Sequence, residues 1–506
     1  MASSSAKTIF SSSFWGILAK ILDALAKFVT IPMLVGFYGK ADYGLIALAF
    51  SLNAYLRLMD LGMNVGSVRF FSMWVSLNEW EKIAKVSRSS IVFYGTIGLI
   101  NAMIFAVMAN YGTQLFNLTA SQLPIYRSMM YILAFSTVLN WVSNVFVQLL
   151  SAKEEIAYIN QISIISSILN FLSAFIAIKF QWTLEGYFIC YTLSTLSPIP
   201  FYIYKLRVFN MNLSKLIKPK WDGKAFKEIL GYSIGIFIMG LFQLTANNLR
   251  PLLLGKFASG IDVLTDYRVI QTIAMLIVAF GGVFMQVLLP SASKVYAENN
   301  IKKMEMMVYD GTKYITILLS FMVFVLIVNA NTLLSLYMGE SYGALTVWLS
   351  LWLITVLISM HNTPVSSLVL STGKIKPLIY SSAISCVLSI PITILLAKKL
   401  NVGAAVIGYL AYIILQIAFY YIYYIPIILK LSGRRLFLRS FLPSFLAGIV
   451  ACIPVYFLDH WMTAMHGYIQ IIINSIVFCL FFFLIHLIFI IKPAELLALK
   501  NKVFAK

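Results

Sequence analysis

Apolar segments of about 20 residues recur along the whole 506-residue chain, and each is long enough to cross a lipid bilayer as a helix. Only 11% of the residues are charged, where a soluble domain would have roughly 25%. The segments are apolar on all sides, without the alternation of a membrane β-strand. We therefore predict an all-α polytopic membrane protein with about fourteen spans, at residues 10–37, 43–66, 88–110, 127–150, 156–178, 186–206, 229–254, 266–290, 312–330, 343–368, 376–397, 402–429, 439–459 and 467–491.

Two halves of the chain contain the same short pattern. The segments Pro32–Gly36 and Pro251–Gly255 both read Pro-x-Leu-x-Gly, and an Asp-Tyr pair follows each of them at Asp42 and Asp266. Membrane transporters are often built from two such repeats, which move against each other around a central site. We therefore predict two pseudo-symmetric six-helix bundles and two further C-terminal helices, divided at 1–206, 207–228, 229–430 and 431–506.

Prolines and glycines near the same end of matching helices are candidate bending points. A proline removes one helical hydrogen bond, and a glycine leaves the backbone free to bend. An ordinary helix end would contain the same residues, so this pattern leaves both interpretations open. The candidate hinge residues are Pro32, Gly36, Pro251 and Gly255.

The net charge is +20, and the distribution of the basic residues indicates how the chain is oriented in the membrane. With the N-terminus inside, 27 basic residues lie in the cytoplasmic segments and 6 in the outer loops. The positive-inside rule then predicts that both chain termini are cytoplasmic, in the cytoplasmic (inner) membrane. The longest basic segment, 207–228, is predicted to be a cytoplasmic linker lying on the membrane, and a nucleic-acid partner is not expected. Its expected lipid-facing residues are Leu213, Leu216, Ile217 and Trp221.

Charged side chains inside the first two spans are the strongest functional signal. Lys20, Asp23 and Lys27 share one helix face through their i, i+3, i+7 spacing. Arg57 lies about a dozen residues from either end of the second span, and Asp60 is close enough to pair with it. A charge at such a depth costs several kcal/mol (about 3) unless it faces water or a partner. We predict that Lys20, Lys27 and Arg57 face a cationic cavity, and that Asp23 and Asp60 pair with them or carry a coupling proton.

The matching helices of the second half add further polar groups. Arg250 and Arg268 lie where snorkelling toward the outer interface is also an adequate explanation, and Asn247 and Asn248 would make the neighbouring surface polar. The five cations and two carboxylates sum to +3, which suits the two to three negative charges of a diphosphate.

Signatures of catalysis are missing from the sequence. It has no phosphate-binding glycine loop with lysine, no Ser/His/Asp set and no metal-ligand spacing among the four cysteines, which all fall within predicted spans. We expect no enzyme activity, no metal and no cofactor, and an energy supply from an H⁺ or Na⁺ gradient or from the membrane potential.

The second span carries a family resemblance. Phe37–Gly44 (FYGKADYG), Met59–Met63 (MDLGM) and Arg69 resemble the N-terminal pattern of polysaccharide transporters, in the branch of O-antigen-type lipid-linked oligosaccharide flippases of the multidrug/oligosaccharidyl-lipid/polysaccharide (MOP) superfamily. The resemblance implies a V-shaped pair of bundles around a cationic cavity. It also implies transfer of an undecaprenyl-diphosphate-linked oligosaccharide to the outer leaflet for surface polysaccharide assembly, with membrane lipids, a polysaccharide polymerase and glycosyltransferases as partners.

Three other functions fit parts of the sequence. A multidrug/cation antiporter of the same superfamily normally has twelve helices and an acidic cavity. A lipid II flippase shares the helix number, but its usual Arg-Asp element is missing from the first span. A membrane glycosyltransferase or polymerase would need a large outer loop, and the longest outer loop expected here has fewer than 20 residues.

Overall fold

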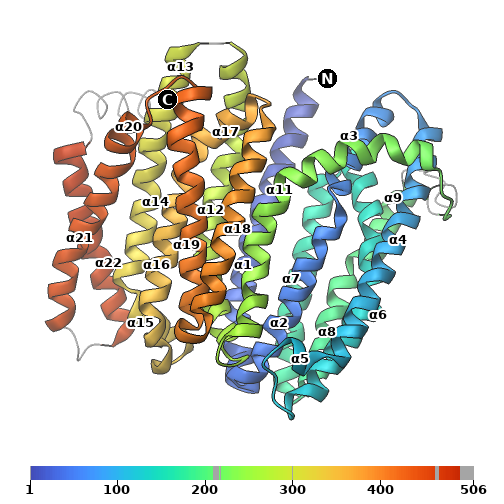
Figure 1. The fold of residues 1–506 in the computed structure, drawn as a ribbon, viewed down its shortest axis with the longest axis horizontal. Helices are drawn as coiled ribbons and strands as arrows, with labels where there is room; N and C mark the ends of the chain where they lie inside the picture. Colours follow the sequence, from blue (N-terminus) through green and yellow to red (C-terminus); the bar gives the residue numbers. More distant parts are fainter. Residues whose placement is uncertain (1, 209–215, 217, 299, 462–465, 491–506) are drawn as a thin grey trace. The chain divides into compact units, whose positions relative to one another are not determined.

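The computed structural model describes residues 2–208, 216, 218–298, 300–461 and 466–490, and in these ranges the chain is helical with no strand (Figure 1). The predicted all-α membrane fold is confirmed. The chain forms two compact units, Met1–Thr272 with Cys386–Ala405 and Ile273–Ser385 with Val406–Lys506. The predicted lobe boundaries at 206 and 229 stay a prediction.

Helices of the first unit account for the first seven predicted spans and the start of the eighth. Their bounds are α1 (Ala2–Tyr38), α2 (Lys40–Leu56), η1 (Arg57–Asp60), α3 (Met63–Ser76), α4 (Trp80–Asn110), α5 (Gly112–Leu115), α6 (Gln122–Ala152), α7 (Ile156–Lys179), α8 (Leu184–Leu196), α9 (Pro198–Val208), α11 (Gly223–Phe257) and α12 (Val263–Ala297), which continues into the second unit.

The remaining predicted spans also coincide with helices, several of them interrupted by 3₁₀ or π turns. Their bounds are α13 (Ile301–Glu305), η2 (Met306–Asp310), α14 (Gly311–Val328), α15 (Ala330–Met338), η3 (Glu340–Leu345), α16 (Thr346–Met360), α17 (Thr363–Ser371), α18 (Ile375–Leu400), α19 (Val402–Phe419), η4 (Tyr420–Ile428), α20 (Gly433–Arg435), η5 (Leu436–Phe441), α21 (Leu442–Trp461), α22 (Gly467–Ile485) and η6 (His486–Ile490).

Length and composition identify the membrane-crossing helices. Nine of the described helices are long and apolar enough to cross a membrane, and a tenth is added if α2–η1 and α3 form one bent span. The first, sixth, seventh and eighth predicted spans coincide with α1, α8–α9, α11 and α12, which that count does not include. Single left-handed residues end several of these helices at short connections, as at Glu154 between α6 and α7 and Asn401 between α18 and α19.

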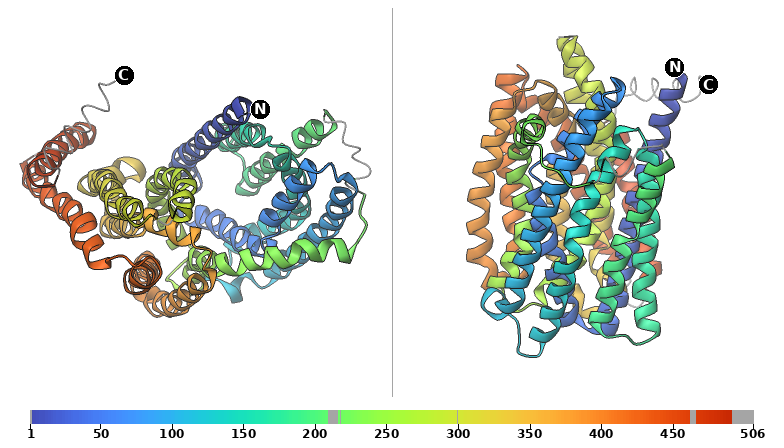
Figure 2. Two further views of the ribbon diagram at one scale, coloured as in Figure 1. Left: turned by 90° about the horizontal axis from the view of Figure 1, so that it is seen from above. Right: turned by 90° about the vertical axis from the view of Figure 1, so that its right-hand side faces the viewer.

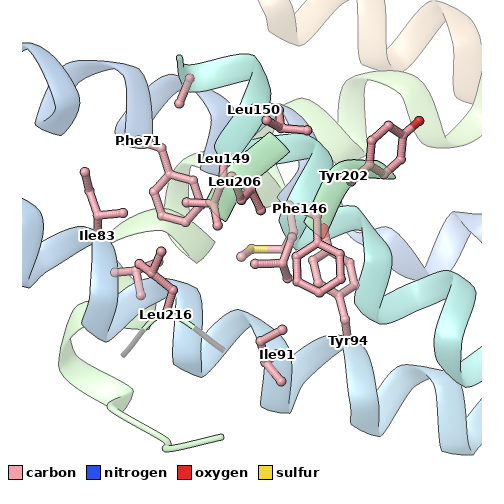
Figure 3. Packing of buried hydrophobic residues seen from close by; sticks show 14 of the residues in the cluster. Phe71, Ile83, Ile91, Tyr94, Phe146, Leu149, Leu150, Tyr202, Leu206 and Leu216 are labelled. Atoms are coloured by element: carbon pink, nitrogen blue, oxygen red, sulfur yellow. The ribbon is translucent and has the colours of Figure 1, made fainter. Parts of the chain in front are cut away.

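The core of the first unit lies where α4 and α6 pack along their length. Phe71, Tyr94 and Phe146 belong to this core (Figure 3). Tyr94 and Trp141 are stacked, with 5.8 Å between their ring centroids. α4, α6, α7 and α8 run side by side, and α1 packs against α7 (Figures 1 and 2). This four-helix wall supports the elements that carry the charged residues.

The linker residue Leu216 was predicted to face lipid, and this prediction is wrong. Leu216 is only 5% exposed and belongs to the core of the first unit, where the Ser87 hydroxyl donates to its carbonyl oxygen at 2.9 Å. The reason is that the start of α4 offers serine and arginine donors that hold the linker backbone, including Arg88 to the Lys218 carbonyl at 2.9 Å. Trp221 is exposed as expected, whereas Leu213 and Ile217 lie outside the described residues.

Close backbone packing joins α11 to the second span. A Cβ at Gly62 would overlap the carbonyl oxygen of Ser233, and a Cβ at Gly66 would overlap the Ser233 hydroxyl. At the other end of α2, a Cβ on Gly44 would lie 2.5 Å from the Ile261 carbonyl oxygen. Glycines therefore allow α11 and the segment before α12 to lie directly on the second span, which brings the two repeated helix pairs together within one unit.

Candidate functional site

The second span is broken at its middle. α2 ends at Leu56, η1 covers Arg57–Asp60, and α3 begins after Leu61 and Gly62, which have φ angles of 51° and 73°. The two halves are bent by 47°. The break at Leu61–Gly62 interrupts the regular helical hydrogen bonds after η1, and such irregular backbone is tolerated in a membrane only where it meets protein or a water-filled cavity.

Arg57 lies at this break with an exposed side chain. Among the residues that the structure describes, its guanidinium group forms no hydrogen bond or ion pair. Its charge, together with those of Asp23 and Arg268, acts on the phenol of Tyr191 in α8. Three of the predicted site residues, one each from α1, η1 and α12, are thus within electrostatic range of this tyrosine.

Arg268 links α12 to α2 through neutral groups. Its guanidinium donates to the Ser51 hydroxyl at 2.9 Å, to the Ala47 carbonyl at 3.4 Å and to the Gln271 side chain at 2.9 Å. Its Nε is buried and has no partner within the described part of the chain. Neutral partners leave the positive charge uncancelled, and an unpaired buried donor is a place where a bound acceptor would lower the free energy.

The first helix contributes one ion pair and one further cation. Lys27 donates to Asp23 at 2.7 Å across an i, i+4 spacing, and both side chains are well exposed. Lys20 lies one turn earlier on the same face and is also exposed. The pairing of Asp23 that the sequence suggested is therefore with Lys27, while the Lys20 charge stays available to a ligand.

Asp60 does not pair with Arg57, contrary to our expectation. Its carboxylate accepts a hydrogen bond from the Tyr94 hydroxyl at 2.7 Å and another from the backbone of Asn64 at 3.1 Å. Gln148 in turn donates to the Tyr94 hydroxyl at 2.8 Å. The η1 turn directs Asp60 toward α4 and α6, so the Arg57–Asp60 pair is replaced by a buried polar chain that holds the broken segment against the core.

Arg250 is buried rather than extended toward an interface, with only 2% of the residue exposed. Its guanidinium contacts the Ala246 carbonyl one turn earlier and the Ser389 hydroxyl of α18 at 3.4 Å. Asn247 beside it is exposed and Asn248 is half-buried. A binding role for these three residues stays a prediction.

The four candidate hinge residues lie within continuous helices. Pro32 is inside α1, and Pro251 is inside α11. A Cβ at Gly36 would meet nothing within 4 Å, whereas one at Gly255 would lie 3.3 Å from Phe116. The repeat thus has one open glycine and one packed glycine, and bending at these residues stays a prediction.

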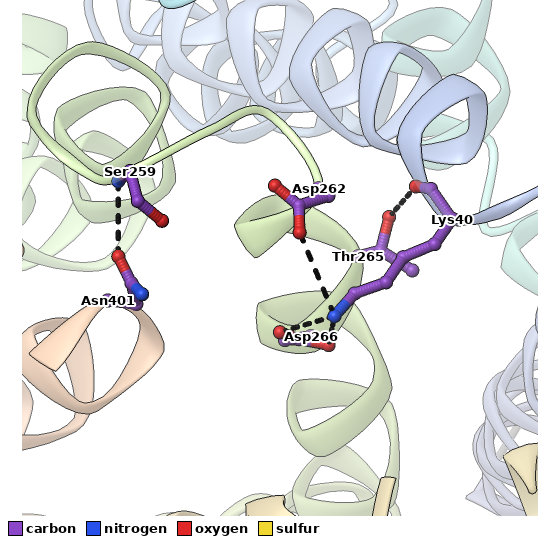
Figure 4. A network of polar contacts seen from close by, with 6 residues as sticks. All are labelled: Lys40, Ser259, Asp262, Thr265, Asp266 and Asn401. Atoms are coloured by element: carbon purple, nitrogen blue, oxygen red, sulfur yellow. Dashed lines mark hydrogen bonds and ion pairs between the residues drawn. The ribbon is translucent and has the colours of Figure 1, made fainter. Parts of the chain in front are cut away.

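An ion-pair cluster at the predicted outer end of the first unit was not expected from the sequence. Lys40 lies 2.8 Å from Asp266 and 3.9 Å from Asp262, and the Thr265 hydroxyl donates to the Lys40 carbonyl at 2.7 Å (Figure 4). We call these four residues the outer clamp. It joins the α1–α2 turn to the start of α12. The repeated Asp-Tyr pair could have indicated this cluster, because Asp266 belongs to the second copy of that pair.

Aromatic residues beside the cations were also missed. Phe50 lies 4.8 Å from Tyr191 and 6.1 Å from Phe188 between ring centroids. Tyr187, Phe188 and Tyr191 have a helical spacing that places an aromatic face on α8, and this spacing could have identified them. Tyr187 and Phe188 are buried in the unit, so these rings pack the helices around the arginine groups.

A sequence model of a family described as polysaccharide biosynthesis protein matches residues 9–296, more than half of the chain. A search of curated protein sequences gave no match.

Solved structures share the fold at low sequence identity. The lipid II flippase MurJ in an inward closed conformation aligns with a TM-score of 0.71 and 14% identity over 93% of this chain and 98% of that one. A multidrug resistance MATE family transporter of the MOP superfamily, inward-facing, aligns with a TM-score of 0.67 and 14% identity over 79% and 92% of the two chains. A MOP superfamily transporter from Pyrococcus furiosus, described as having a binding pocket of reverse polarity, aligns with a TM-score of 0.60 and 14% identity over 88% and 96%.

Proposed function

The chain belongs to the polysaccharide biosynthesis protein family, and from this premise we propose that it moves an undecaprenyl-diphosphate-linked oligosaccharide from the cytoplasmic to the outer leaflet of the inner membrane. The observation that carries the proposal is the exposed Arg57 at the break of the second span, whose guanidinium group has no hydrogen-bond or ion-pair partner among the described residues. An arginine at this depth is costly, and a diphosphate is an anion that would offset the cost.

The charge balance of the site supports a diphosphate ligand. Lys20, Lys27, Arg57, Arg250 and Arg268 carry five positive charges, and Asp23 and Asp60 carry two negative charges. Hydrogen bonds from Arg268 to neutral groups do not change its charge. A net charge of +3 matches a ligand with about two to three negative charges near neutral pH, since the second ionisation of a phosphate has a pKa near 6.

We infer an alternating-access mechanism. The diphosphate enters from the cytoplasmic side and is bound by the cations, the sugars occupy the adjoining hydrated space, and the polyprenyl tail stays in lipid. Neutralising the cations lowers their mutual repulsion and favours closure on that side. Opening on the other side then requires the outer clamp to separate, with bending near Pro32 and Pro251. Coupling to H⁺, Na⁺ or the membrane potential acts through Asp23 or Asp60.

Lipid II transport is the second candidate, because a lipid II flippase has the same fold over nearly the full length of both chains and its substrate is named as a lipid. A multidrug/cation antiporter is disfavoured, because a site with net positive charge repels cationic drugs. The two lipid substrates differ in their sugars, so a direct comparison of transport separates them.

The test is reconstitution in liposomes with a defined lipid-linked oligosaccharide, measuring its arrival in the opposite leaflet, with lipid II as the comparison substrate. Arg57→Ala should lower the rate at least tenfold while the protein still inserts, and Arg57→Lys should retain part of the activity. Lys179→Ala, which removes a positive charge from a predicted outer loop, is the matched control and should transport normally. Full activity in Arg57→Ala would refute the assigned role.

A further inference from the structure

Three π-helical turns of the second unit meet at one place. They are η2 (Met306–Asp310), η4 (Tyr420–Ile428) and η5 (Leu436–Phe441). η5 contacts η2, and the short helix α20 lies against both η4 and η5. π-turns are rare and frequently occur at functional sites, so a meeting of three of them indicates a local role beyond spanning the membrane.

A shallow cavity of about 470 Å³, open to the surface, lies beside these turns and before the thirteenth span. Its wall is formed by Ser432, Arg434, Arg435, Leu438 and Arg439. The three arginines are exposed, and an anion between their guanidinium groups would be attracted by all of them. Guanidinium groups match the geometry of phosphate oxygens and bind them with two hydrogen bonds.

The wall of the cavity is held in place by its neighbours. The Arg435 guanidinium stacks 4.4 Å above the ring of Tyr309 and lies 3.4 Å from the Glu305 carboxylate. The Tyr309 hydroxyl accepts a hydrogen bond from the Ser432 backbone at 2.9 Å. A Cβ at Gly433 would lie 2.7 Å from the Tyr421 carbonyl oxygen, so the turn fits against η4 only with glycine. Arg435 is therefore preorganised by contacts within the protein.

The charge and the surroundings of the cavity favour a lipid. Glu305 offsets one of the three positive charges, which leaves about +2 near the cavity. Leu438 lines the cavity and is 45% exposed, and Phe437 and Ile427 nearby are exposed too. The charge distribution of the chain predicts that this loop is cytoplasmic, where the leaflet contains anionic lipids.

We propose that this cavity binds the phosphate head group of an anionic phospholipid from the cytoplasmic leaflet. Arg434 and Arg439 contact the phosphate oxygens beside the anchored Arg435, and Leu438 lies against the acyl chain. The bound lipid fixes the cytoplasmic start of α21. Free phosphate shares the head-group chemistry, but it would not use the apolar side of the cavity. The assignment is independent of the transported substrate.

The experiment measures the thermal unfolding midpoint of the purified full-length protein in detergent after addition of phosphatidylglycerol or phosphatidylcholine. Phosphatidylglycerol should raise the midpoint of the wild type more than phosphatidylcholine does. The double variant Arg434→Gln/Arg439→Gln should lose most of this difference. The double variant Lys374→Gln/Lys376→Gln removes two exposed charges from another predicted cytoplasmic loop and should keep it.

Further measurements distinguish lipid binding from phosphate binding, and a loss of binding from a loss of folding. Inorganic phosphate at millimolar concentration should produce only a small part of the lipid effect, and an equal effect would overturn the lipid assignment. Leu438→Gln keeps all three arginines and should reduce the response to phosphatidylglycerol several-fold, even if the arginine variant folds poorly. An unchanged lipid response in both variants, or an equal loss in the lysine control, would overturn the proposal.

Discussion

Gly62 gives the sharpest test of how the broken span is built. Its φ angle of 73° is left-handed, and its Cα faces the backbone of α11, so a Cβ there would overlap the Ser233 carbonyl oxygen and lie 3.1 Å from the Phe237 nitrogen. Gly373 has nearly the same φ angle, 70°, but a Cβ there would meet nothing within 4 Å. The two glycines differ in packing and match in φ angle, so they form a natural pair of variants.

The expected magnitudes follow from these environments. A left-handed alanine costs about 1–2 kcal/mol of backbone energy, and this cost is common to Gly62→Ala and Gly373→Ala. Crowding a closely packed contact adds about 1–3 kcal/mol in Gly62→Ala alone. The entropy that alanine removes from the unfolded chain is common to both variants and cancels in the comparison. Gly62→Ala should therefore destabilise the protein by about 1–3 kcal/mol more than Gly373→Ala does.

The assay is thermal unfolding of the purified variants in one detergent, followed by tryptophan fluorescence. At about 2–4 °C per kcal/mol for a unit of this size, the two midpoints should differ by several degrees. Gly62→Ala should also lower transport at temperatures where it is folded, because the turn positions Arg57. Equal midpoints for the two variants would mean that α11 does not rest on Gly62, and the description of the break would be wrong.

Two further outcomes follow from the structure. Gly36→Ala fills open space inside a helix and should raise stability by about 0.5–1 kcal/mol, while transport falls if α1 bends there; unchanged transport would remove Gly36 as a hinge. Lys40→Gln removes the cation between the Asp262 and Asp266 carboxylates and should loosen the outer clamp. A cysteine placed at Thr265 in a cysteine-free background should then react several-fold faster with an impermeant maleimide, and an unchanged rate would argue against the clamp.

The spans were predictable because the cost of burying unpaired backbone groups in lipid leaves long apolar helices as the only solution. The break at Leu61–Gly62 was not, since the apolar run from 43 to 66 continues through it. What sets the break is the contact with Ser233, which lies about 170 residues further along the chain. The prediction for Leu216 was wrong for a similar reason. Its burial depends on contacts with α4, which the sequence of its own segment does not reveal.

The candidate site was predictable as a set of charges but not as a set of partners. The rarity of charge in a membrane marks Lys20, Arg57 and Arg268 from sequence alone. Which atoms they meet depends on neighbouring helices, and so Asp60 bonds to Tyr94 while Arg268 bonds to Ser51. No charge pattern pointed to these neutral partners.

The partners also divide the five cations by their readiness to bind a ligand. Lys27 is neutralised locally by Asp23, and the buried Arg250 would have to give up its contact with Ser389. Arg268 keeps its charge and a buried Nε without a partner in the described chain, and Arg57 is exposed at a break in the membrane helix. Because affinity falls when a group must first leave another partner, Arg57 of η1 should dominate affinity, and Arg268 can contribute through its Nε without giving up its hydrogen bonds to Ser51 and Gln271. Under the proposed function, the total charge of the site favours an anionic ligand, and we expect that ligand to be held at the break in the second span.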